Sequence, residues 1–132
     1  MSIRSMFETV VGELELKKRW RQLKARKQQL PENHRKAHDA IERYLMYSAG
    51  IADGAILTAM AEDLLELFEQ SAADGTPVSA IVGDNPVEFA EEFGRNYAEG
   101  AWIKKERARL TEAIEAITDG DLDKLDHRKE ES

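Results

Sequence analysis

The fold is decided by residues 56–68, which read ILTAMAEDLLELF. Large apolar side chains recur in this segment at the three- and four-residue spacing of an α-helix, and they cover a wide arc of its surface. Asp53 precedes the segment and suits an N-cap, and the pair Asp74-Gly75 follows it, with Gly75 suited to a left-handed helix end. We therefore predict that this helix is the central and most buried one.

Proline places the helices in the first part of the chain. A proline disfavours helical geometry at the residue before it, so Pro31 ends a helix predicted over residues 3–29. The same proline suits the first turn of a second helix, predicted to reach Ser48. Gly50 and Gly54 then frame a short connection to the central helix.

The second part of the chain is predicted to hold a short helical turn over residues 78–82 and a last helix over 86–117. Asp84 or Asn85 would cap this last helix, which is expected to be interrupted or bent near Gly94 or Gly100. No segment alternates β-branched or aromatic residues with polar ones, as a strand would. The predicted fold is all-α, a single multihelical domain of four to five helices with a long N-terminal and a long C-terminal helix.

Residues 1–117 form this predicted domain, and residues 118–132 are predicted to be an acidic, flexible tail because they lack a periodic apolar face. The 132 residues include no cysteine, which excludes disulfides and thiolate metal sites. No stretch approaches the roughly 18 apolar residues of a membrane span. Glu8 interrupts the N-terminus before any apolar run develops, so no signal peptide is predicted and a cytoplasmic location is expected.

The net charge of −7 is unevenly distributed. Residues 1–30 hold eight Lys and Arg against three Asp and Glu, whereas residues 31–99 hold four against fourteen. Seven of the basic residues fall between Lys17 and Lys27, and we call this segment the basic run. It either pairs with the protein's own acidic residues or contacts an anionic partner, and nucleic acid is one alternative. The candidate contacts for such a partner are Lys17, Lys18, Arg21 and Lys24.

Two apolar stripes lie on opposite sides of the first predicted helix. The front stripe consists of Ile3, Phe7, Val10 and Leu14, and the rear stripe of Leu16, Trp20, Leu23 and Leu30. A straight helix cannot press both stripes onto one core. Either the helix breaks near Gly12, or its two halves are buried against different bodies, and we favour the second alternative. The rear stripe would then pack on the domain, and the front stripe would meet either a folded-back segment of the same chain or a protein partner, which could be a second copy of the chain.

Residues that could carry chemistry are few. His34, His38 and Glu42 share one face of the second helix, but Arg35 opposes cation binding there, and a solvated helix face is the favoured interpretation. A calcium-loop spacing in the tail has lysine at the position that requires glycine; its candidate ligands are Asp119, Asp121, Asp123 and Glu130. No nucleophile elbow or phosphate-binding glycine loop is present. We therefore predict no metal, no cofactor and no enzymatic activity, and a metal- or small-molecule-dependent enzyme is the alternative.

Several segments in order resemble one bacterial family. These are ELELKKRWR at 13–21, the Leu30-Pro31 break, ERYL at 42–45, LFE at 67–69 leading into ADG at 73–75, Val78, GDNP at 83–86 and Phe89. Over residues 3–115 they resemble the domain of unknown function family numbered 1048, small all-helical cytosolic proteins of mostly Gram-positive bacteria. The resemblance implies a multihelical fold and no established activity. Members of the family are described as encoded near PadR-type transcriptional regulators, which implies an accessory or regulatory partner role. The function predicted from the sequence is therefore a non-enzymatic helical interaction module.

Overall fold

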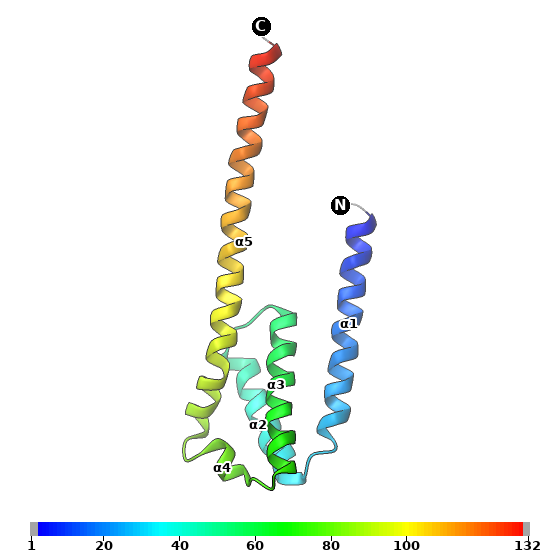
Figure 1. The fold of residues 1–132 in the computed structure, drawn as a ribbon, viewed down its shortest axis with the longest axis vertical. Helices are drawn as coiled ribbons and strands as arrows, with labels where there is room; N and C mark the ends of the chain where they lie inside the picture. The colour runs from blue at the N-terminus through cyan, green and yellow to red at the C-terminus, as the bar shows by residue number, and fades with distance from the viewer. Residues whose placement is uncertain (1–2, 131–132) are drawn as a thin grey trace. The chain divides into compact units, whose positions relative to one another are not determined.

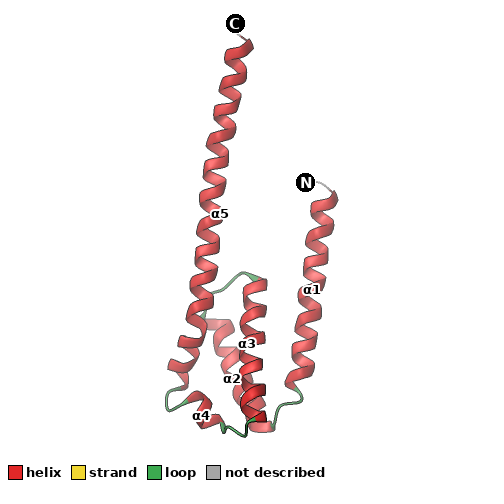
Figure 2. Cartoon of the chain, in the orientation of Figure 1, coloured by secondary structure: helices red, strands yellow, loops and turns green. Residues whose placement is uncertain are grey.

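A computed structural model describes the backbone of residues 3–130 and the side chains of residues 11–122. Within residues 3–130 the chain forms five α-helices and no strand (Figure 2). Figure 1 labels them in order: α1 Ile3–Lys27, α2 Glu32–Ser48, α3 Gly54–Ala73, α4 Val78–Val82 and α5 Pro86–Glu130. The prediction of an all-α fold with a long N-terminal and a long C-terminal helix is confirmed.

The chain divides into two compact units, the first ending at Ala98 and the second beginning at Glu99. In the first unit α3 is the central helix, because both α1 and α2 pack against it. It contributes more buried side chains than any other helix: Thr58, Met60, Ala61, Leu64, Leu65 and Phe68 are all buried. The helix that contains the apolar segment at 56–68 is therefore the central and most buried one, as its composition predicted.

The helix ends follow the capping residues seen in the sequence. The Asp53 carboxylate accepts a hydrogen bond of 3.0 Å from the Ile56 N–H, and the Asn85 side-chain oxygen accepts one of 3.0 Å from the Glu88 N–H. Gly75 has a positive φ of 72°, as expected for a left-handed helix end. Pro31 lies one position earlier than predicted, at the N-cap of α2, where its backbone is extended.

α5 corrects the expectation of an interrupted last helix. It is continuous through Gly94 and Gly100 and does not end before residue 118, since its helical backbone continues to Glu130. At Gly94 the missing side chain serves packing, because a Cβ there would lie 2.8 Å from Leu45 Cδ2. The sequence beyond Gly100 is rich in alanine, leucine, glutamate, lysine and arginine, which favour a helix. The flexibility of residues 118–132 stays a prediction.

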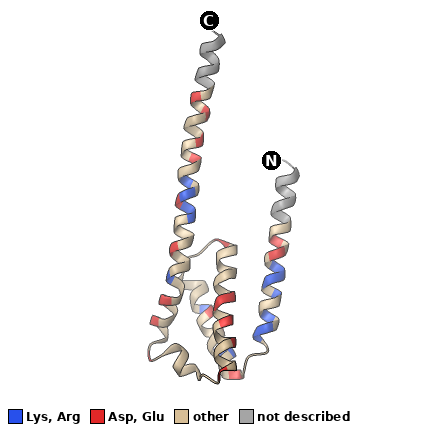
Figure 3. Cartoon of the chain, in the orientation of Figure 1, with Lys and Arg blue, Asp and Glu red and all other residues tan. Residues whose placement is uncertain are grey.

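Ion pairs link α1 to the acidic residues of α3. The Arg19 guanidinium donates a hydrogen bond of 2.7 Å to the Glu62 carboxylate, and Arg26 pairs in the same way with Glu69 two turns further along both helices. The hydrogen bond from Arg19 lowers the pKa of the Glu62 carboxyl. All four side chains are about a third or more exposed, so each pair adds little stability. Figure 3 shows the basic part of α1 and the acidic residues of α3.

The Tyr97 phenol of α5 should ionise only at unusually high pH. Burial, together with a hydrogen bond that the phenol donates to the Asp63 carboxylate of α3, raises the pKa of Tyr97 to about 12. Because this pKa lies above the unfolded value of about 10, the contact stabilises the fold below that pH and is lost as the pH rises through 12. Asp63→Asn should lower the pKa of Tyr97, as phenolate absorbance would show after subtraction of the Tyr97→Phe titration. A wild-type Tyr97 that ionises near 10 would contradict the contact.

Candidate functional site

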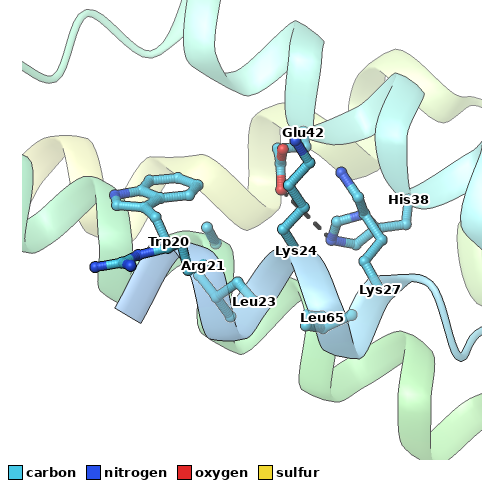
Figure 4. A pocket seen from close by; sticks show the side chains of 9 residues that line it. Trp20, Arg21, Leu23, Lys24, Lys27, His38, Glu42 and Leu65 are labelled. Carbon is cyan, nitrogen blue, oxygen red and sulfur yellow. Dashed lines mark ion pairs between the residues drawn. The ribbon is translucent and has the colours of Figure 1, made fainter. Parts of the chain in front are cut away.

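A groove opens between α1 and α2, with α3 as its floor. Its cavity measures about 300 Å³. Nine residues line it: Trp20, Arg21, Leu23, Lys24, Lys27, His38, Glu42, Ala61 and Leu65 (Figure 4). The floor is apolar, one wall carries three cations from the basic run, and the other carries an imidazole and a carboxylate. The groove therefore combines an apolar surface with a mixed-charge rim.

His38 is the most deeply buried polar residue of this groove, at 1% exposure. Its Nδ1 lies 3.3 Å from Asp39 Oδ1, while its Nε2 has no hydrogen-bond partner and faces Glu42 Oε2 at 3.6 Å. The ring stands edge-on to the Phe68 ring, with 5.7 Å between centroids. The interpretation of this helix face as solvated is therefore wrong for His38. The sequence did hold a signal, since His38, Ile41 and Leu45 recur at the spacing of the buried face of α2.

The two histidines of α2 have separate environments. His34 Nε2 lies 2.8 Å from the Thr76 carbonyl oxygen, in the loop that follows α3. Its ring also meets Phe68 edge-on, at 6.4 Å between centroids. Among the residues that the structure describes, no three His, Asp or Glu side chains are grouped so that they could hold a metal ion. Of the calcium-loop pattern, Asp119 and Asp121 are exposed on α5; the side chains of Asp123 and Glu130 lie outside the described residues.

The structure divides the basic run into two sets of side chains. Arg19, Arg26 and Lys27 pair with the protein's own carboxylates, and the Lys27 ammonium lies 3.1 Å from Asp39 Oδ1. Burial acts to raise the pKa of the Asp39 carboxyl, but hydrogen bonds from Lys27 and His38 outweigh it and lower that pKa. The predicted partner contacts form the second set. They are exposed, and none forms an ion pair with a described side chain: Lys17, Lys18, Arg21 and Lys24.

The two apolar stripes of α1 lie on one continuous helix. It is continuous through Gly12, so the alternative of a broken helix is wrong. The rear stripe packs on the first unit as predicted: Leu23 is buried, and Leu16 Cδ1 approaches Gly54 of α3. Of the front stripe, Leu14 is 55% exposed. The other three side chains of that stripe lie outside the described residues: Ile3, Phe7 and Val10.

A second apolar surface, which the sequence interpretation missed, lies on α5 within the second unit. At 100° per residue its four large side chains fall within an arc of about 60°. These side chains, which we call the α5 stripe, are 41%, 64%, 54% and 61% exposed: Ile103, Leu110, Ile114 and Ile117. Their spacing of seven, four and three residues is typical of a helix that pairs with another helix. That spacing was readable from the sequence. The last helix, however, was expected to be interrupted or bent near Gly94 or Gly100, before the stripe begins, and to end at Ile117, the last residue of the stripe.

The folded chain is thus a small all-helical protein with apolar surfaces on two of its helices. None of the helices, over the residues described, is long and apolar enough to cross a membrane. The chain belongs to the family described as Protein of unknown function (DUF1048), whose sequence profile matches residues 11–115. A search of curated protein sequences finds no match to the chain.

Proposed function

We propose that this protein is a non-enzymatic helical interaction module that associates with a second copy of itself or with a protein partner. One observation carries the proposal: within the second unit, four large aliphatic side chains on one face of α5 are 41–64% exposed. Scattered exposed leucines are ordinary, but a contiguous row at helical spacing is typical of an interaction site. The exposed Leu14 of the front stripe on α1 supports a second contact of the same kind.

The size of the α5 stripe sets the strength expected of this association. Fully burying one such side chain stabilises a complex by about 1.5–3 kcal/mol, and these are already partly shielded. Two chains bring eight of them together, a gain of the same order as the roughly 4–15 kcal/mol that association costs. We therefore expect a dimer that dissociates on dilution.

Ile114→Glu should shift the protein from the dimer mass towards the monomer mass. The substitution places a charge in the middle of the α5 stripe, where pairing would have to desolvate it. Size-exclusion chromatography with light scattering over a dilution series measures the change, and we expect at least a tenfold loss of affinity. Phe7→Glu applies the same measurement to the front stripe on α1.

Ala116→Glu is the matched control, because Ala116 is exposed on α5 but lies away from the stripe. It adds the same charge to the same helix and should leave the mass unchanged. A wild-type protein that stays monomeric at the highest concentration, and binds no partner in pull-downs, would remove the proposal. Equal weakening by Ile114→Glu and Ala116→Glu would show that the stripe is not the contact.

Nucleic acid remains the alternative partner for the basic run. The four cations of that run that form no ion pair with a described side chain support it, while Arg19, Arg26 and Lys27 are engaged by the protein's own carboxylates. Fewer free charges mean fewer phosphate contacts and a weaker dependence of binding on salt. The apolar stripe has no use in that function, so we favour a protein partner.

A further inference from the structure

The groove between α1 and α2 carries more positive than negative charge. Two cations on its α1 side, Arg21 and Lys24, form no ion pair with a described side chain. The third cation, Lys27, lies 3.1 Å from the Asp39 carboxylate, so its charge is balanced within the protein. On the α2 side the described lining includes one carboxylate, that of Glu42. Two unpaired cations therefore remain against one carboxylate, and this balance favours an anionic ligand.

The rest of the lining is mainly apolar. Leu23, Ala61 and Leu65 are buried beneath the groove, and Trp20 adds a half-buried indole. The cavity of about 300 Å³ lies at the lower end of the range of about 300–1,000 Å³ that is typical of small-molecule sites. A ligand that fits this groove is therefore small and has an apolar body.

His38 adds a buried polar atom to this lining. Its Nε2 has no hydrogen-bond partner among the described residues, although the side chain is almost fully buried. Buried polar atoms without a partner are rare in native proteins, whereas ligand sites combine an apolar lining with a few polar groups. The unpaired nitrogen beside an apolar floor therefore favours a binding site over an ordinary contact between helices.

We propose that the groove binds a small apolar molecule that carries one carboxylate, such as a medium-chain fatty acid. Its apolar body lies on Leu23 and Leu65, and its carboxylate lies between Arg21 and Lys24, which are nearly one helical turn apart on α1. The guanidinium can donate two parallel hydrogen bonds to a carboxylate, and the ammonium adds a second positive charge. The site lies within the first unit of one chain, so it goes beyond the proposed association and does not depend on it.

The two sides of the groove determine where the carboxylate lies. Trp20 and Arg21 line one end of the groove and Lys27 and His38 the other (Figure 4). The Glu42 carboxylate on α2 lies 3.6 Å from His38 Nε2 and would repel a ligand carboxylate placed beside it. The ligand carboxylate therefore belongs on the α1 side, and Glu42 weakens its binding.

Trp20 can report whether the groove is occupied. Trp102→Phe removes the other tryptophan, which is 63% exposed in the second unit. Titration of this variant with sodium octanoate should change the Trp20 fluorescence saturably. We expect 1-octanol, which has the same chain length and no charge, to bind roughly tenfold more weakly because it forms no charge-assisted hydrogen bond. Equal affinity for the two molecules, or no saturable change with octanoate, would overturn the inference.

Three substitutions in the Trp102→Phe background locate the carboxylate. Lys24→Gln should weaken octanoate binding roughly fivefold, and Glu42→Gln should strengthen it severalfold, because they remove an attractive and a repulsive charge respectively. Lys18→Gln is the matched control, since Lys18 is an exposed cation of α1 that does not line the groove, and it should leave the affinity unchanged. Equal weakening by Lys18→Gln and Lys24→Gln would indicate attraction to the helix as a whole, and weaker binding by Glu42→Gln would place the carboxylate on the other side; either result would contradict the proposed site.

Discussion

Phe68→Ala should lower the free energy of unfolding by about 3–5 kcal/mol, a large share of the roughly 5–15 kcal/mol by which small domains are stable. Phe68 of α3 is 0% exposed, and its ring contacts the rings of both His34 and His38 of α2 in edge-to-face geometry. Truncation would leave a cavity where α2 and α3 meet and would remove both ring contacts. Urea denaturation followed by circular dichroism measures the change.

Phe89→Ala is the matched control for this experiment. Phe89 is partly exposed on α5 and stacks on Phe93 at 6.3 Å between ring centroids, so the same truncation removes much less buried surface. We expect a loss less than half that of Phe68→Ala. Equal losses at the two positions would show that α3 is not the centre of the core.

Gly94→Val should destabilise the fold by about 1–3 kcal/mol, although valine is the better helix former. A Cβ at this position would lie 2.8 Å from Leu45 Cδ2, and Leu45 is only 2% exposed, so its side chain has little room to move. The branched side chain would push α5 away from α2 or force Leu45 out of a preferred rotamer. The same denaturation measurement applies.

Two further variants identify the cause of that loss. Gly12→Val makes the same substitution in α1, where a Cβ meets nothing within 4 Å, and it should leave stability unchanged or slightly raised. Gly94→Val combined with Leu45→Ala should cost less than the sum of the two single changes, because the truncation makes room for valine. Additive losses would mean that the two residues do not compete for space.

Local sequence signals predicted most of the fold. Asp53, Asn85 and Gly75 mark helix ends by side-chain hydrogen bonds or by a left-handed backbone, which depend on near neighbours alone. The apolar arc of α3 likewise predicted its burial. By contrast, the last helix was expected to be interrupted or bent near Gly94 or Gly100. A sequence alone does not distinguish a glycine that weakens a helix from a glycine that lets two helices approach each other.

For the candidate surfaces, too, some properties could be predicted from the sequence and others depended on the tertiary structure. The opposed stripes of α1 were visible from helical periodicity, and so was the basic run. Which cations of that run pair with the protein's own carboxylates depended on the register of α1 against α3, since Arg19 and Arg26 meet Glu62 and Glu69 across 43 residues of chain.

The sequence by itself determined an all-helical protein, the position of nearly every helix end and the helix that forms the core. These properties follow from backbone preferences and from the periodicity of apolar residues, which act over a few positions. Only the tertiary structure decided that His38 is buried and that Gly94 is a packing position. Those properties depend on which side chains from distant segments occupy the same space, and local patterns do not contain that information.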